Sequence, residues 1–339
     1  MTKLKELIGM MKDKASQGKA AILSQRATLS LLRATSHDSF TPPTSKHLST
    51  LLTVGDGSRA TASAAMDLLM DRLQSTQSSA VALKCLIAVH YVLKRGSFIM
   101  RDQLPYSGGG RNYLNLSKFR DRSSPVCWEL SSWVRWYAKH VEQLLWASRI
   151  LGFFLGVEAD QDSTQGCNLR LLGGSWMKAG EERASGLTNG ELLRETEALL
   201  AVVEGIGGIP DAASMKGNKL VYEISSLVED DGIVVLSEML VRVNELSERF
   251  GFLSFGEMVE LVYMFSRLEK CKEMVGAAEK QRLLLNLVRE VKEKAEKMMF
   301  SEEGKTISTH RTTKSDMFEF PKLFINSVDL VRFSSARLL

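Results

Sequence analysis

Residues 80–95 read AVALKCLIAVHYVLKR, a run in which apolar side chains occur on nearly every side of a helix. They are Val81, Leu83, Cys85, Leu86, Ile87, Val89, Val92 and Leu93. A helix that is apolar nearly all round is buried on most sides. We therefore expect a central helix with other helices packed around it, and His90, which lies on it, to be buried or half-buried.

Helical periodicity continues on both sides of this segment. Ser124-Pro125 reads as an N-cap followed by proline at the first helical position, and Ser254 with Glu257 reads as a capping box. Strictly alternating, strand-like runs are scarce. The expected helices are 3–15, 19–35, 44–53, 58–75, 80–95, 124–151, 189–206, 216–229, 232–250, 254–268 and 277–299. The pattern predicts an all-α protein, an irregular α-solenoid (superhelix) of about ten antiparallel helices.

Composition divides the chain into a helical domain and a tail. Residues 1–300 are expected to form one helical domain, and 301–339 a short C-terminal tail without a core pattern. Within the domain, 105–112 reads as a flexible loop, and the Gly-rich, polar stretch 157–188 as a long loop or flexible insert.

Cysteine spacing and hydropathy favour a cytoplasmic protein. The cysteines are far apart and show no CxxC spacing, so zinc sites and disulfides are not expected; they are Cys85, Cys127, Cys167 and Cys271. No run of about 18 apolar residues predicts a membrane span. Lysines interrupt residues 1–20, which excludes a signal peptide.

Positive charge is concentrated near the N-terminus. The net charge of the chain is +4, but residues 1–50 carry +5, residues 84–122 carry +6, and the remainder carries −7. Such a field attracts phosphates. Residues 3–15 form an amphipathic pattern that fits membrane contact and an ordinary surface helix equally well. Lys84, Lys94 and Arg95 are expected to face solvent and widen the positive surface.

Four segments together resemble one known family. They are 32–37 (LRATSH) with 42–48 (PPTSKHL), 82–90 (ALKCLIAVH), 115–121 (NLSKFRD) and 134–140 (VRWYAKH). The first is similar to the phosphoinositide motif of ANTH/ENTH-domain clathrin assembly proteins, in which a Lys-Ala-Thr turn precedes a Lys-x-Lys/Arg-His group. The chain most resembles the plant members. The resemblance implies an ANTH-like domain over 1–300, with an ENTH-like lipid-binding part at about 20–155.

The resemblance implies a phosphoinositide site made of Arg33, His37, Lys46 and His47. A guanidinium fork, an ammonium group and imidazole donors at a helix start suit clustered phosphates. This sequence departs from the family at Arg33, which replaces Lys, at Thr44, which replaces the first Lys of the second group, and by one extra residue. These departures leave the preferred headgroup open. Taken without the resemblance, the residues fit a solvated helix connection better than a binding site.

The implied function is that of an endocytic adaptor. Its expected partners are phosphatidylinositol 4,5-bisphosphate membranes, clathrin and coat adaptors, and vesicle SNARE helices bound among residues 216–299. Its expected location is peripheral on membranes, at clathrin-coated pits and vesicles and at the Golgi. The tail lacks Asn-Pro-Phe and Asp-Pro-Phe motifs, so clathrin binding rests on the resemblance alone.

Other functional classes stay open or are disfavoured. No P-loop, HExxH or GxSxG motif occurs, so we expect no enzyme, no cofactor and no metal. A helical-repeat protein–protein scaffold without lipid binding remains an alternative. A nucleic-acid binder is a third reading, but the basic segments lack aromatic stacking platforms, and we expect no nucleic-acid partner.

Overall fold

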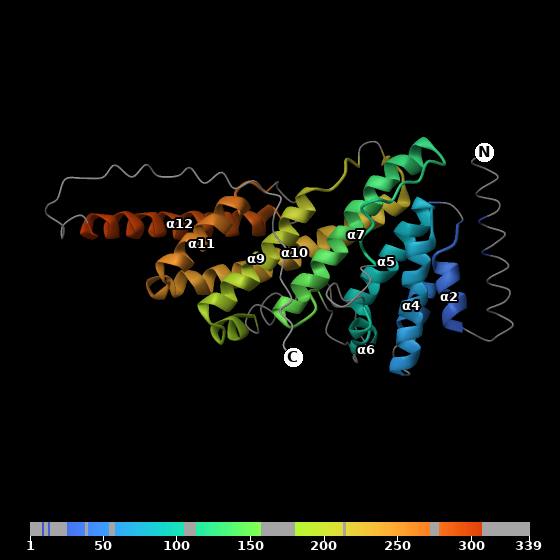
Figure 1. Ribbon diagram of the computed structural model, residues 1–339, viewed down its shortest axis with the longest axis horizontal. Helices are drawn as coiled ribbons and strands as arrows, with labels where there is room; N and C mark the ends of the chain where they lie inside the picture. The colour runs from blue at the N-terminus through green and yellow to red at the C-terminus, as the bar shows by residue number, and fades with distance from the viewer. Residues whose placement is uncertain are drawn as a thin grey trace, which may run out of the picture. The chain divides into compact units, whose positions relative to one another are not determined.

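A computed structural model describes residues 9, 13, 26–37, 40–53, 58–104, 113–156, 180–212, 215–271 and 278–306. Over these residues the regular secondary structure is helical, and the elements whose bounds the structure gives are ten α-helices and one 3₁₀ turn (Figure 1). The predicted all-α class is therefore confirmed. The chain divides into a compact unit, Met1–Glu296, and a second unit, Lys297–Leu339.

The helices follow one another with mostly short connections, and their starts agree with the capping signals. Ser124 accepts the Cys127 N–H ahead of Pro125, and Ser254 and Glu257 cap each other's backbone N–H groups. The elements are α2 (Arg26–Ala34), α3 (Ser45–Leu52), α4 (Arg59–Ser75), α5 (Ser79–Arg95), α6 (Phe98–Asp102), α7 (Pro125–Leu151), α9 (Asn189–Gly207), α10 (Lys219–Glu248), η4 (Phe250–Phe252), α11 (Phe255–Leu268) and α12 (Ala278–Thr306).

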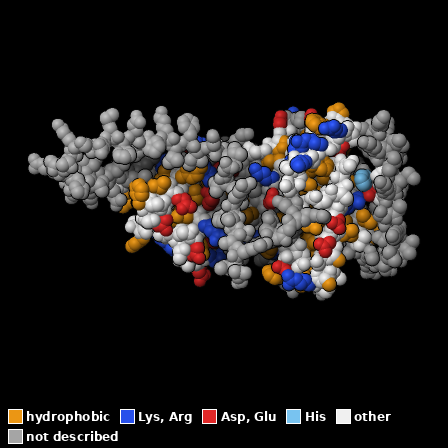
Figure 2. Space-filling view, viewed as in Figure 1, with side chains coloured by type: hydrophobic (Ala, Val, Ile, Leu, Met, Phe, Trp, Pro, Cys, Tyr) orange, Lys and Arg blue, Asp and Glu red, His pale blue; other side chains and the backbone are white. Residues whose placement is uncertain are grey.

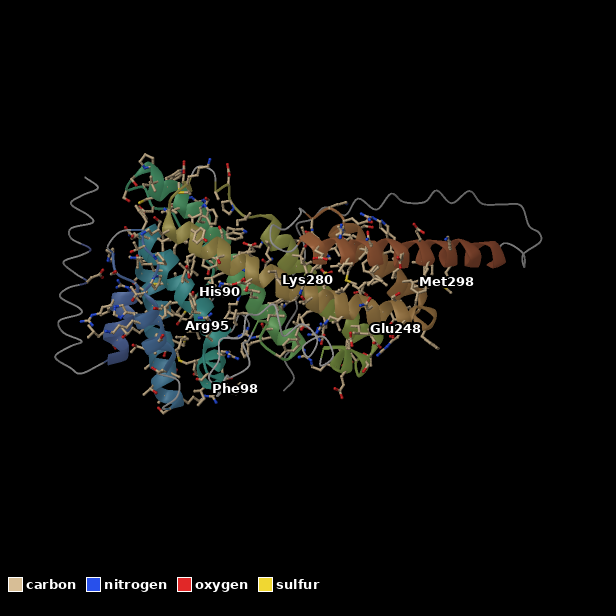
Figure 3. The ribbon with its side chains drawn as sticks, turned by 180° about the vertical axis from the view of Figure 1, so that it is seen from behind. His90, Arg95, Phe98, Glu248, Lys280 and Met298 are labelled. Carbon is tan, nitrogen blue, oxygen red and sulfur yellow. The ribbon has the colours of Figure 1, made fainter. Side chains whose placement is uncertain are left out.

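Helix α5 is the centre of the first unit, as its sequence predicts. It packs against α7, α4, α10, α3 and α2. Its side chains are buried on all faces along most of its length, and His90 has no exposed surface. Figure 3 shows His90 in the interior, whereas Phe98, at the start of α6, lies at the periphery.

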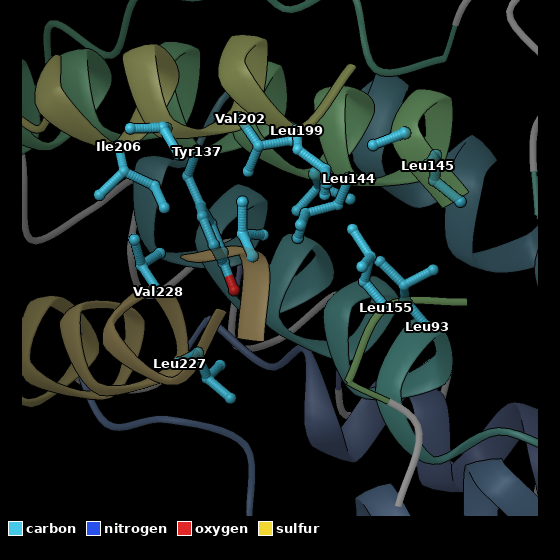
Figure 4. Packing of buried hydrophobic residues seen from close by; sticks show 14 of the residues in the cluster. Leu93, Tyr137, Leu144, Leu145, Leu155, Leu199, Val202, Ile206, Leu227 and Val228 are labelled. Carbon is cyan, nitrogen blue, oxygen red and sulfur yellow. The ribbon is translucent and has the colours of Figure 1, made fainter. Parts of the chain in front are cut away.

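The core continues from α5 across α7 to α9 and α10. Figure 4 shows the ring of Tyr137, from α7, between α9 side chains such as Val202 and Ile206 and the α10 side chain Val228. All four are buried. Because each helix packs on neighbours close to it in sequence, the arrangement is the succession of packed helices expected of an irregular solenoid.

Several expected boundaries are wrong. Residues 216–229 and 232–250 were expected to form two helices, but α10 is a single helix from Lys219 to Glu248. Residues 180–185, expected to belong to a loop, are helical, because Arg249 donates to the carbonyl oxygens of Ala184, Ser185 and Leu187 and so satisfies the end of this turn. Helix α6 was not predicted, and α12 extends past residue 299 to Thr306.

Other predictions fall on residues that the structure does not describe. These are most of the helix predicted at 3–15, the loop at 105–112, residues 157–179 of the insert and residues 307–339 of the tail. None of the described helices combines the length and the apolar character needed to cross a bilayer.

Candidate anion-binding site

Helix α2 ends in a turn that leaves one cation exposed. The Thr35 hydroxyl and N–H both donate to the Leu31 carbonyl, at 2.7 and 3.0 Å, and close the last helical turn. Arg33 lies in that turn and is exposed. The following carbonyl, that of Ser36, accepts a hydrogen bond from Lys84 Nζ at 3.0 Å, which attaches the turn to α5.

Helix α3 begins directly after Pro42-Pro43, which keep the chain extended. Thr44 is its N-cap, with φ −70° and ψ 144°, and its carbonyl accepts the N–H groups of His47 and Leu48. The Thr44 side chain makes no capping hydrogen bond. The N–H groups of Ser45 and Lys46 therefore have no helical acceptor, and the positive end of the helix dipole lies at the same place.

Arg33, Lys46 and His47 come together where α2 packs on α3. Partial burial lowers the pKa of His47, and the positive charges of Arg33 and Lys46 lower it further. Charges at a protein surface act strongly only over short distances, since solvent and salt screen them. Three of the four residues singled out in the sequence thus share one positively charged surface, which we call the cationic corner.

His37 lies beside the corner but already has a partner. Its backbone N–H and its ring Nδ1 both contact Asp13 Oδ2, at 2.6 and 2.8 Å. Arg72 Nη2 donates to Asp13 Oδ1 at 2.8 Å and to the Thr35 carbonyl at 2.7 Å. Nδ1 of His37 is therefore not available to a phosphate, and the residue holds the turn between α2 and α3 in place.

Most of the residues that support this turn carry no local signal in the sequence. Asp13 and Arg72 were not singled out, because their partners are 24 and 59 residues away along the chain. Lys84, expected to face solvent, is buried, because Ser36 offers its ammonium group an acceptor. One signal was present in the sequence: Lys84 lies on a helix that is apolar on nearly every side. A lysine in that position needs a buried acceptor for its ammonium group.

The predicted extension of positive charge along α5 is only partly present. Lys94 is half-buried and paired with Asp231 at 2.9 Å, so it does not widen the surface. Arg95 is exposed, with its guanidinium over the Tyr91 ring. In the part of the chain that the structure describes, no group of three His, Cys, Asp or Glu side chains is arranged to hold a metal ion.

The fold is all-helical, and the candidate site is a group of cations at the connection between α2 and α3. Residues 27–209 match the ANTH domain family. The chain is also similar to three Arabidopsis thaliana proteins that share the name "Putative clathrin assembly protein". It is 46% identical to one of them over 81% of this chain and 74% of the relative, 30% identical to a second over 80% and 78%, and 29% identical to a third over 80% and 91%. The chain belongs to the ANTH domain family.

Proposed function

We propose that this chain is a peripheral membrane adaptor that binds phosphoinositide headgroups at the cationic corner and links the membrane to clathrin coat assembly. The observation that carries the proposal is the proximity of Arg33, at the end of α2, to Lys46 and His47, at the start of α3. Each of these groups favours an anion, and no catalytic step is involved.

The chemistry of the corner suits clustered phosphates. The Arg33 guanidinium can donate two parallel hydrogen bonds to one phosphate, and the Lys46 ammonium adds a mobile positive charge. The free N–H groups at the start of α3 supply further donors. His47 gains a second N–H donor and a positive charge once a phosphate favours its charged form. Phosphatidylinositol 4,5-bisphosphate, with adjacent phosphates on a ring, is the ligand we propose.

The corner alone would bind weakly. A basic residue near an anionic leaflet contributes roughly 1 kcal/mol, so the two cations and His47 together supply only a few kcal/mol. Stable recruitment therefore needs further attachment, which coat partners can provide through avidity. The shared name of the Arabidopsis relatives supports a part in clathrin assembly. We propose coat adaptors as further partners, and coated pits, coated vesicles and the Golgi as the location.

A liposome sedimentation assay tests the membrane role. We expect the chain to sediment with vesicles containing phosphatidylinositol 4,5-bisphosphate, and the Arg33→Ala/Lys46→Ala double variant to bind them at least tenfold more weakly, since about 2 kcal/mol is lost. Arg194→Ala/Lys270→Ala is the matched control, because it removes one exposed arginine and one exposed lysine from α9 and the end of α11. An equal loss of vesicle binding in both double variants would contradict a specific role of the cationic corner.

A protein-binding role is the second candidate, and the surface of α11 favours it. Phe255, Val259 and Tyr263 are exposed at a spacing of four residues on one face of α11, and Phe252 beside them is 84% exposed. Exposed apolar surface of this kind is typical of a docking site. We propose it for a vesicle SNARE helix, or for another helical partner if the chain is a scaffold without lipid binding. Equal sedimentation with neutral and anionic vesicles, or none, would favour the scaffold.

A further inference from the structure

A second group of cations lies on the segment before α7 and on α7 itself. Arg120 Nη1 donates to the Phe119 carbonyl at 2.7 Å, and Arg135 Nη1 donates to the same oxygen at 3.0 Å. Two guanidinium groups thus converge on one neutral acceptor. Each guanidinium has five N–H donors, so most of them remain available to a ligand.

The charge of this pair is not neutralised within the described part of the chain. Neither Arg120 nor Arg135 forms an ion pair there. Partial burial lowers the pKa of Arg135, and the positive charge of Arg120 lowers it further. The two guanidinium groups repel each other. An anion bound between them would be attracted to both and would offset that repulsion.

A pocket of about 570 Å³ adjoins Arg135. Its polar lining comes from the segment before α7 and from α7, and includes Asn115, Ser117, Ser132, Arg135 and Lys139, with the Trp136 ring as an apolar wall. Glu142, also in the lining, adds a carboxylate. The volume lies within the usual range for small-molecule sites, and the hydroxyl, amide and cationic donors are those that bind phosphate.

The pocket and the cationic corner are attached to the same end of α5. Asp121 Oδ2 accepts the Ser79 N–H at 2.8 Å, whereas Lys84 Nζ donates to the Ser36 carbonyl at 3.0 Å. Ser79 and Lys84 are separated by roughly 7.5 Å along the helix axis. Figure 2 shows Lys and Arg side chains gathered over the first half of α7 on the viewed face.

We propose that the pocket lined by Arg135 and Lys139, with Arg120 beside Arg135, is a second phosphate-binding site, distinct from the cationic corner, for a polyphosphorylated inositol headgroup. The same chemistry recognises the headgroup on a membrane or free in solution. The pocket can bind a headgroup whether or not the cationic corner does. If both sites bind headgroups on one membrane, avidity strengthens the weak membrane binding of the corner.

Calorimetric titration of the full chain with soluble inositol 1,4,5-trisphosphate tests the proposal. We expect two sites in the unchanged protein, and one in either Arg120→Ala/Lys139→Ala or Arg33→Ala/Lys46→Ala. Arg135→Gln keeps a donor for the Phe119 carbonyl and should weaken the second site roughly tenfold. Lys118→Ala/Arg122→Ala is the control, since it removes two exposed cations of the same segment that neither line the pocket nor share the Phe119 carbonyl with Arg135.

The outcomes separate this proposal from that of the corner. Loss of all binding in Arg33→Ala/Lys46→Ala, or an unchanged two-site titration in Arg120→Ala/Lys139→Ala, would overturn the second site. If only the Arg120→Ala/Lys139→Ala variant loses binding of inositol trisphosphate, the result supports the second site and contradicts headgroup binding at the cationic corner. Thermal melts of each variant identify any change caused by misfolding, and Arg135→Gln then provides the independent test.

Vesicle assays distinguish the two sources of the headgroup. Weaker sedimentation of Arg120→Ala/Lys139→Ala with phosphatidylinositol 4,5-bisphosphate vesicles supports a membrane-bound headgroup. Unchanged sedimentation together with a lost titration site supports a free inositol phosphate. Binding of a phosphoserine peptide at the pocket without any binding of inositol trisphosphate would overturn the proposal and indicate a protein partner instead.

Discussion

Asp13 holds the turn beside the cationic corner in place. Its carboxylate joins His37, in the turn after α2, to Arg72 on α4. Burial alone would raise the pKa of this carboxyl, but the hydrogen bonds from His37 and Arg72 outweigh burial and lower it. The carboxylate therefore stays charged at neutral pH and fixes the turn from which Arg33 projects.

His47 should make headgroup binding depend on pH. Its pKa is lowered in the free protein, and a bound phosphate would raise it, so binding takes up a proton and becomes tighter as the pH falls from about 7.5 to 6. The ratio of the affinity of the unchanged protein to that of His47→Gln should rise severalfold over this range. Fluorescence titration with vesicles measures both affinities, and the ratio cancels protonation of the phosphates. A ratio independent of pH would exclude His47 from the site.

Residue identities at the corner could be predicted because they are local. Arg33, Lys46 and His47 lie within one short stretch of sequence, and the two prolines between α2 and α3 indicate the turn. The engagement of His37 could not be predicted, because its partner Asp13 belongs to a different part of the chain and carries no local signal.

Helix α10 shows how tertiary contacts override a local pattern. Asp230 and Asp231 lie between the two helices predicted at 216–229 and 232–250, yet α10 is continuous through them. The buried Asp231 carboxylate contacts Lys94, His90 and His140, at 2.9, 3.1 and 2.8 Å. These partners come from α5 and α7, so no reading of residues 216–250 alone could supply them.

The charges around Asp231 set a pH limit on stability. Burial lowers the pKa of His90 despite the neighbouring Asp231, so the folded protein keeps this imidazole neutral. Below a pH of about 6.5 the unfolded chain binds a proton at His90 that the folded chain does not bind, and the free energy of unfolding falls. The pKa of Asp231 lies well below its usual range, since its cationic and hydrogen-bonding neighbours outweigh burial, and its stabilising effect is lost only at lower pH.

Asp231→Asn should destabilise the protein strongly. The change leaves the Lys94 ammonium half-buried without its carboxylate, and removing one partner of such a pair costs about 3 kcal/mol or more. Asp230→Asn, an exposed neighbour on the same helix, should change the free energy of unfolding by less than about 0.5 kcal/mol. Urea unfolding at neutral pH measures both. Similar values for the two variants would show that Asp231 contributes little to the packing of α10 on α5 and α7.

Over the whole molecule, the fold class and the helices could be predicted from the sequence more completely than the positions of the surface charges. Periodicity and capping residues fixed most of the described helices to within a few residues, because these signals act over a single turn. The distribution of charge was less predictable. Lys84 and Lys94 belong to the basic segment 84–122, but one is buried and the other is paired with an acid from α10. A net charge per segment cannot show which cations face solvent.

The cationic corner and the proposed pocket site both belong to the first unit. The cationic corner and the pocket beside Arg135 use different elements, so each can be removed without the other. Under this proposal, α11 stays available to a protein partner while both sites contact lipid.

A crystal structure of the chain with inositol 1,4,5-trisphosphate would test the central claim most directly. We predict phosphate oxygens within hydrogen-bond distance of the Arg33 guanidinium, the Lys46 ammonium and the His47 ring, at the start of α3. A structure in which the ligand occupies other parts of the surface while Arg33, Lys46 and His47 contact only solvent would contradict the account.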